Sequence, residues 1–147
     1  MKLPKELENG FIIFSLIAIF FLFMEALSYS NLFYLRLINI FFVFYGVNRS
    51  IKMNLSQGKK RFVENAASAI ITSLVGVFLS AIGLVLYSHI KGGDSYIQTL
   101  PRTFLFAGHP SINTYSICLL FEGIASSVIV TMLLMLYWNN RFTTDEP

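Results

Sequence analysis

Three ionisable residues, Glu25, Arg36 and Glu122, lie inside long apolar stretches of this 147-residue chain. An ionisable side chain within a bilayer is costly and usually faces the interior of a helical bundle. Glu25 and Arg36 flank a predicted turn at residues 28–31, about 4.5 and 7.5 Å from it at a rise of about 1.5 Å per residue. We therefore expect both side chains at nearly the same depth, where they form an ion pair.

Glu122 is placed deeper than this pair. If its helix starts at Ser111, Glu122 lies about 16 Å along it, near the midplane of a bilayer. The face formed by Arg36 and Asn39 is its expected neighbour, so two carboxylates compete for one guanidinium. Because desolvation favours the neutral form of the carboxylate that is left over, we expect Glu122 to be protonated unless another subunit supplies a cation.

This intramembrane polar cluster of Glu25, Arg36, Asn39 and Glu122 has two interpretations. In the first, Glu122 is a buried hydrogen-bonding group that fixes the packing of the helices, as polar groups commonly do in membrane proteins. In the second, Glu122 is the proton or cation site of a transporter. The sequence favours the first interpretation and leaves the second open.

The sequence contains none of the common catalytic or cofactor motifs. It has no phosphate-binding glycine loop, no His-Glu-x-x-His segment, no pair of cysteines and no nucleophile elbow. His89, Asp94 and His109 are of metal-ligating types, but they lack the close spacing of a metal site. We therefore expect a protein that is not an enzyme and that holds no metal and no cofactor.

The elements that must hold the polar cluster are membrane-spanning helices. Hydrophobic residues make up 55% of the chain and charged residues 13%, about half of the roughly 25% that is typical of soluble domains. Together with a mean hydropathy of +0.65, this excludes a soluble globular fold. Four apolar stretches have the about 20 residues that a span needs: 10–29, 32–53, 62–89 and 111–138. We predict an all-α fold, a four-transmembrane-helix bundle that forms one domain over residues 1–147.

The basic residues predict the orientation of this bundle, because the cytoplasmic ends of spans carry an excess of Lys and Arg. With both termini in the cytoplasm, eight basic residues lie on the inner side: Lys2, Lys5, Arg49, Lys52, Lys59, Lys60, Arg61 and Arg141. Two, Lys91 and Arg102, lie on the outer side. Topology thus accounts for the net charge of +3, and no nucleic-acid partner is expected.

Small residues recur at steps of three and four along the third stretch, at Ser73, Gly76, Ser80 and Gly83. Gly123 and Ser127 have the same spacing in the fourth stretch. Small residues at this spacing let two helix backbones approach closely. We expect the third and fourth helices to pack tightly, with Glu122 beside the contact. A seam between copies of the chain is the alternative.

Two short passages in the second and fourth stretches carry a family likeness. One begins Leu35-Arg36-Leu37-Ile38-Asn39 and ends at Gly46; the other is Phe121-Glu122-Gly123-Ile124-Ala125-Ser126-Ser127, followed by residues 132–137. They resemble a family of uncharacterised four-span bacterial membrane proteins, grouped under a domain of unknown function. In that family an aspartate-proline pair follows the third span, whereas Gly92-Gly93-Asp94-Ser95 stands here. The resemblance implies a four-span architecture and residence in the bacterial inner membrane, and it implies no activity.

Together these features predict a non-catalytic integral membrane protein that acts through helix contacts, as an accessory or assembly subunit of a larger inner-membrane complex. Its expected partners are the lipid bilayer and other membrane subunits or copies of itself. The alternative is a small homo-oligomeric transporter or channel. In that case Glu122, with Arg36 and Asn39, binds a proton or cation.

Overall fold

The computed structural model describes residues 4–101 and 108–143, and this part of the chain is all-helical. The long helices are α1 (Lys5–Ala26), α3 (Asn39–Ser56), α4 (Phe62–Lys91) and α6 (Ile112–Tyr137). Shorter helices connect or follow them: α2 (Phe33–Leu37), α5 (Asp94–Ile97) and the 3-10 helix η1 (Asn139–Arg141). The predicted all-α fold is confirmed.

Three of the helices, α1, α4 and α6, are long and apolar enough to cross a membrane. They correspond to the first, third and fourth predicted spans. Large apolar side chains cover their outer faces; Ile19, Phe121 and Leu136 are 66, 62 and 71% exposed. Such a surface suits contact with lipid better than contact with water, so the structure supports a helical membrane protein.

The second predicted span, at residues 32–53, takes a different form. It is divided into α2 and α3 at Ile38, where the Phe41 N–H donates to the Ile38 carbonyl in a tighter 3-10 turn (3.0 Å). Helix α3 has 18 residues, and polar residues such as Arg49 fill its second half, so it is less apolar than the other three long helices. A fourth span therefore stays a prediction.

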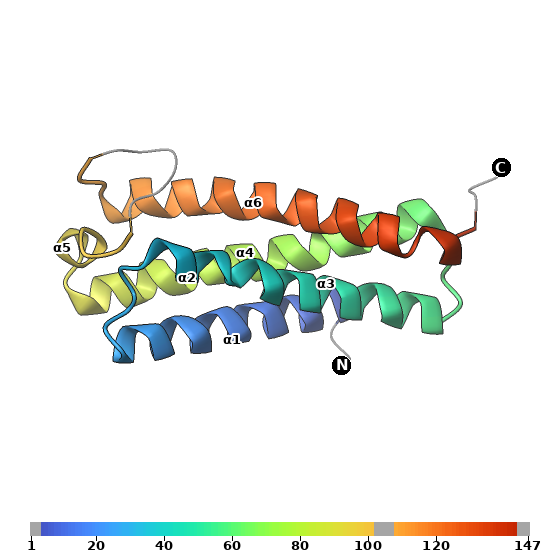
Figure 1. Cartoon of the computed structure of the whole chain (residues 1–147), viewed down its shortest axis with the longest axis horizontal. Coiled ribbons are helices and arrows are strands. Elements are labelled where there is room, and N and C mark those ends of the chain that lie inside the picture. Colours follow the sequence, from blue (N-terminus) through green and yellow to red (C-terminus); the bar gives the residue numbers. More distant parts are fainter. Residues whose placement is uncertain (1–3, 102–107, 144–147) are drawn as a thin grey trace.

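Both terminal segments lie at one end of the bundle, where they contact the turn between α3 and α4 (Figure 1). Lys5 Nζ donates to Gln57 Oε1 (3.0 Å), and the Thr143 N–H donates to the Lys60 carbonyl (2.9 Å). We call this the terminal end, and the opposite end, which carries α5, the loop end.

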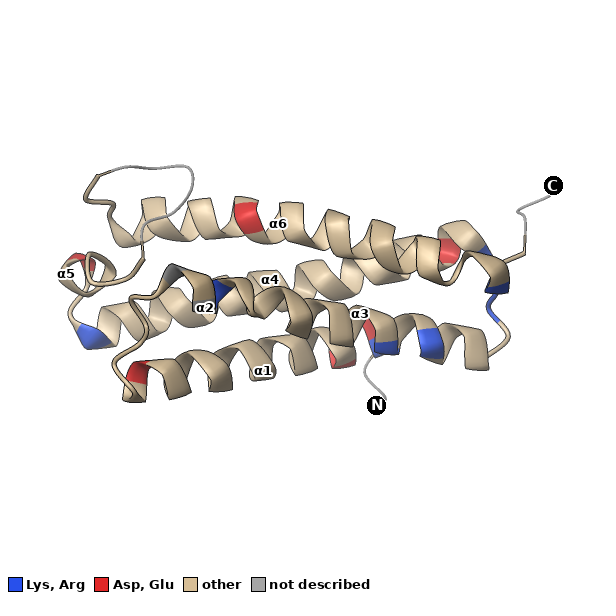
Figure 2. Ribbon diagram, viewed as in Figure 1, with Lys and Arg blue, Asp and Glu red and all other residues tan. Residues whose placement is uncertain are grey.

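Charged residues gather toward these two ends (Figure 2). At the terminal end they include Lys59, Lys60 and Arg61 of the turn between α3 and α4. Of the basic residues that predict the orientation, Lys2 and Arg102 lie outside the described residues. Which side of a membrane each end faces stays a prediction.

At the loop end, α5 is tied to the start of α6. Asp94 Oδ1 accepts a hydrogen bond from the Ile112 N–H (2.8 Å), and the Ser111 hydroxyl caps α6 by accepting one from the Thr114 N–H (3.3 Å). The chain leaves α4 through Gly92, whose φ of 128° is unfavourable for residues with a Cβ. The connection after α4 is thus anchored at α5 before it returns to the bundle.

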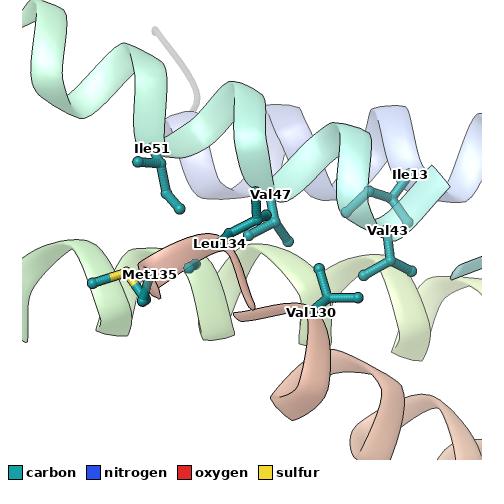
Figure 3. Close-up of a cluster of buried hydrophobic side chains, with 8 residues drawn as sticks. Ile13, Val43, Val47, Ile51, Val130, Leu134 and Met135 are labelled. Carbon is teal, nitrogen blue, oxygen red and sulfur yellow. The ribbon is translucent and has the colours of Figure 1, made fainter. Parts of the chain in front are cut away.

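A core of apolar side chains fills the terminal half of the bundle (Figure 3). Its members are Ile13, Val43, Val47, Ile51, Ala69, Val130, Leu134 and Met135. Ile13 of α1 is fully buried and lies against Gly46 of α3 and Gly76 of α4. A Cβ at Gly76 would stand 2.6 Å from Ile13 Cγ2. Glycine therefore lets α1, α3 and α4 close around Ile13.

The glycines on the small-residue stripe of α4 face α1 in the structure, although the sequence predicts that they face α6. Gly76 lies against Ile13, and Gly83 lies against Phe14. Helix α6 meets α4 through Gly123 instead, where a Cβ would stand 2.5 Å from Val77 Cγ1. Helix α4 is rotated about its axis so that the large Ile13 side chain fits between glycines. The spacing of residues within α4 does not reveal this rotation.

The serines at the small-residue positions of α4 and α6 form no hydrogen bonds between helices in this structure. The hydroxyls of Ser73, Ser80 and Ser127 donate to carbonyls of their own helices, at Ile70 (2.9 Å), Gly76 (2.8 Å) and Gly123 (2.8 Å). Their polar groups are thereby satisfied without a partner on a neighbouring helix.

Candidate functional site

Arg36 and Glu122 form a salt bridge between α2 and α6, through Arg36 Nη2 and Glu122 Oε2. They are the charged residues of these two helices, visible as a basic segment of α2 and an acidic segment part-way along α6 (Figure 2). Their side chains are 17 and 21% exposed. A charge in such surroundings needs a partner, so the two side chains stabilise one another where water is scarce.

Tyr115 extends this ion pair toward the loop end. Arg36 Nη1 donates to the Tyr115 hydroxyl (3.3 Å), which in turn donates to the Pro101 carbonyl (2.9 Å). Tyr115 lies seven residues before Glu122, so both project from one face of α6. This spacing is the signal that identifies Tyr115 as part of the site, and sequence reasoning missed it. The tyrosine hydroxyl thereby connects the guanidinium to the Pro101 carbonyl.

Asn39, the first residue of α3, lies near the same site. Its Oδ1 is buried without a hydrogen-bond partner, and the residue lines the same cavity as Arg36 and Glu122. The structure therefore brings together three of the four residues of the predicted polar cluster.

Glu25, the fourth, lies apart from them near the loop end. It lies close to Tyr96 of α5, and its Oε2 is buried without a hydrogen-bond partner. Burial, and then the nearby Glu25 carboxylate, raise the pKa of the Tyr96 phenol. The sequence predicts that Glu25 and Arg36 form an ion pair because they lie at nearly the same depth. In the structure Arg36 pairs with Glu122 instead, because the Arg36 side chain points from α2 toward α6.

The ion pair lies in the wall of a cavity of about 630 Å³ in the loop half of the bundle. Residues of α1, α2, α3, α4 and α6 bound this cavity. Aromatic side chains form much of its wall, from Phe14, Phe20, Phe21, Tyr29, Tyr87 and Tyr115. Its volume falls within the range of about 300–1,000 Å³ that is usual for ligand pockets. An apolar chamber with one ion pair suits a molecule that is itself mostly apolar and has one polar end.

A second polar group, which sequence reasoning did not identify, crosses the terminal half. The Thr72 hydroxyl donates to Ser50 Oγ (3.1 Å), Ser50 and Ser68 share a hydrogen bond (3.2 Å), and Ser68 donates to Glu6 Oε1 (2.8 Å). Ser68 and Thr72 stand four residues apart on α4, a spacing that places them on one face. These hydroxyls link α1, α3 and α4.

Arg49 of α3 also connects α3 to α1 in the terminal half of the bundle. Its Nη1 donates to Oδ1 of the fully buried Asn9, and its Nη2 forms a salt bridge with Glu8 Oε1 (3.0 Å). The sequence treats Arg49 only as a marker of topology. Its contacts to α1 give it a packing role as well.

The candidate metal ligands are separately engaged. His89 Nδ1 contacts the carbonyl of Val85 on its own helix (2.8 Å), and Asp94 accepts from the Ile112 N–H. Among residues 4–101 and 108–143, no group of three or more His, Cys, Asp or Glu side chains is arranged to hold a metal ion.

Comparison with protein-family models, with curated proteins and with solved structures finds no match to this chain. The resemblance to the four-span bacterial family therefore stays a prediction. The functional argument rests on the cavity and on the residues that line it.

Proposed function

We propose that this chain is a non-catalytic integral membrane protein that binds an amphipathic molecule from the bilayer in its loop-half cavity. The observation that carries the proposal is the cavity of about 630 Å³, which is mostly apolar and has the Arg36–Glu122 pair in its wall. The apolar part of a ligand would contact the aromatic wall. Its polar end would lie at the ion pair, where a few placed polar groups fix orientation.

The surface of the bundle supports a location in the membrane. Three helices have the length and apolarity of spans, and a ligand that dissolves in lipid reaches such a bundle without crossing water. The basic turn at Lys59, Lys60 and Arg61 favours a cytoplasmic terminal end. We therefore propose residence in the bacterial inner membrane with both termini inside.

Photo-crosslinking tests the proposal. Hexadecanol that carries a diazirine is added to the protein in phosphatidylcholine nanodiscs, and crosslinked peptides are mapped by mass spectrometry. We expect labelling at residues that line the cavity. Ala18→Phe should weaken it, because Ala18 lines the cavity and the added ring occupies part of the cavity volume.

The matched control is Ile19→Phe, on the same helix, whose side chain is 66% exposed and does not line the cavity. This variant should be labelled like the unmodified protein. Labelling only on lipid-facing side chains, equal in both variants, would contradict the proposal.

A transporter or channel with Glu122 as a proton or cation site is a second candidate, favoured by the position of Glu122 in the cavity wall. Proton or cation flux in reconstituted vesicles that is lost in Glu122→Gln would support it. The role of an accessory or assembly subunit in a larger complex also stays a hypothesis. It is compatible with ligand binding, because a bound lipid can mediate contact between subunits.

A further inference from the structure

Asn39, the first residue of α3, stands in the cavity wall three residues after Arg36. Among the described residues that line the cavity, its Oδ1 is the buried side-chain oxygen without a hydrogen-bond partner. A polar side chain that ties membrane helices together bonds to a neighbouring helix, and this oxygen does not. Because an unpaired buried acceptor is costly, Asn39 Oδ1 lacks a donor that a ligand can supply.

Several other polar groups of the wall already have partners. Arg36 is bound to Glu122 and to the Tyr115 hydroxyl. The hydroxyls of Ser80 and Ser126 donate to carbonyls of their own helices, at 2.8 and 2.9 Å. A charged head group would therefore have to compete with existing contacts for its counter-charge. An uncharged donor finds in Asn39 an acceptor for which it has no competitor.

The carboxamide of Asn39 can present its oxygen to the cavity without movement of a helix. Its acceptor oxygen and its donor nitrogen are carried on one plane, and rotation about the last side-chain torsion exchanges their positions. Ile40 and Val43 follow Asn39 on the part of α3 that lines the cavity. The amide thus marks the boundary between the polar part of the wall and its apolar part.

The cavity also borders the apolar outer surface of the bundle. Leu22 of α1, Leu32 and Leu37 of α2 line it and are exposed at the surface. A long apolar chain can extend past these leucines toward lipid, whereas a head group with many hydroxyls would meet too few polar partners. The wall therefore suits one small polar group on a long chain.

We propose that the polar end of the ligand is a single uncharged hydroxyl, on a long-chain alcohol or on a neutral glycerolipid, and that this hydroxyl donates a hydrogen bond to Asn39 Oδ1. This inference rests on the proposed ligand-binding function and names the class of ligand. The apolar chain lies against the apolar and aromatic wall, and Arg36 and Glu122 keep the contacts that they already have.

The test compares probes that share one chain: hexadecanol, its methyl ether, which accepts a hydrogen bond but cannot donate one, and the ionised hexadecanesulfonate. Each competes with the diazirine-bearing hexadecanol in phosphatidylcholine nanodiscs. Affinities are expressed as mole fractions of the nanodisc lipid, because the probes partition differently into bilayers. For the unmodified protein we expect hexadecanol to bind about tenfold more tightly than the ether, the effect of one hydrogen bond. The sulfonate should bind more weakly than hexadecanol.

Dioleoylglycerol, which carries one free hydroxyl on two chains, and its methyl ether form a second pair of probes. A loss of affinity on methylation is expected in at least one of the two pairs. The pair with the larger loss identifies the source of the hydroxyl, a free alcohol or a neutral glycerolipid.

Asn39→Leu replaces the carboxamide by an apolar side chain of similar size. The affinity for hexadecanol should fall about tenfold, to that of the ether, and the affinity for the ether should not change. Because Asn39 Oδ1 bonds to no other group, the variant should melt at or above the temperature of the unmodified protein.

The matched control is Asn48→Leu, the same substitution on the same helix. Asn48 Oδ1 accepts from Trp138 Nε1 (2.9 Å), and the residue does not line the cavity. This variant should keep the preference for hexadecanol over the ether.

Equal affinities of each alcohol and its ether for the unmodified protein would overturn the inference, and this result does not depend on how a variant folds. A preference that persists in folded Asn39→Leu, or tighter binding of the sulfonate than of hexadecanol, would overturn it as well. In these cases the proposed function survives, because an amphipathic probe still binds in the cavity. If no probe competes with the label at the cavity, the proposed function fails too.

Discussion

In the terminal half of the bundle, the fully buried Ile13 fills the space between Gly46 and Gly76, and hydroxyls bond one another across α3 and α4. In the loop half, the same long helices separate around a cavity of about 630 Å³. The difference follows from the residues at the helix contacts. In the terminal half, glycines opposite a branched side chain let the helices pack closely. In the loop half, the long side chains of Arg36 and Glu122 connect helices that lie on either side of the cavity.

This comparison shows how one bundle combines a closely packed half with a half that contains a cavity. In lipid, helices associate through van der Waals packing and hydrogen bonds rather than through burial from water. Close packing at the terminal end therefore supplies the stability.

The largest effect is expected from Ile13→Ala in the closed half. Removal of a fully buried side chain from a glycine-lined site leaves a cavity and should lower the free energy of unfolding by about 2–5 kcal/mol. Denaturant titration in detergent micelles, followed by circular dichroism, measures it. Ile19→Ala, at a position 66% exposed, is the control and should change it by less than about 0.5 kcal/mol. Equal losses would mean that Ile13 is not the centre of the packing.

Two glycine substitutions on α4 sharpen the contrast between the halves. In Gly76→Ala the new Cβ meets Ile13 Cγ2 at 2.6 Å and the Gly10 carbonyl oxygen at 3.3 Å, neither of which can move far. Overpacking of this kind should cost about 1–3 kcal/mol. In Gly83→Ala the Cβ meets only the ring edge of Phe14, at 3.0 Å, and the better helix propensity of alanine offsets the contact. Thermal melts should rank Gly76→Ala well below Gly83→Ala; the reverse order would show that α4 is not packed more tightly at Gly76 than at Gly83.

Tyr115→Phe tests the loop half alone. The change removes the hydroxyl that bonds both Arg36 and the Pro101 carbonyl, and the expected cost is about 1–1.5 kcal/mol. Hydrogen exchange should speed up at residues 94–101 and remain unchanged around Ile13. Tyr137→Phe, on the same helix at a side chain that is 75% exposed, should have no effect. Faster exchange around Ile13 would show that the two halves are coupled.

The smallest effect is expected at the exposed salt bridge between Lys59 Nζ and Glu64 Oε1 (3.0 Å). The hydrogen bond that Lys59 donates to Glu64, and then the charge of Glu64, raise the pKa of Lys59 above its usual value of 10.5. The contribution to stability is thus complete below pH 10.5 and is lost as pH rises through the higher pKa of the folded protein. Glu64→Gln should remove this small alkaline loss, and salt should mask the difference. An alkaline melting profile that Glu64→Gln leaves unchanged at low salt would contradict it.

Much of the architecture could be predicted from the sequence, because apolar length and helical rise are properties of a single segment. The spans at α1, α4 and α6 were predictable on this ground, as was the inward direction of Arg36 and Glu122. The division at Ile38 was not, because no proline or glycine near Ile38 marks a break in the helix. Tyr115 and the hydroxyls of Ser50 and Thr72 were also missed, because a single polar group in a helix does not reveal its partner.

The sequence alone indicates that this protein is helical, that its long apolar segments suit a bilayer, and that its few deep charges need partners. The tertiary structure is needed to identify which residues those partners are. Depth along a helix follows from residue number, but rotation about the helix axis depends on which side chains fit between neighbouring helices. The rotation of the helices brings Arg36 to Glu122 and turns Gly76 toward Ile13. It also leaves the cavity beside the ion pair.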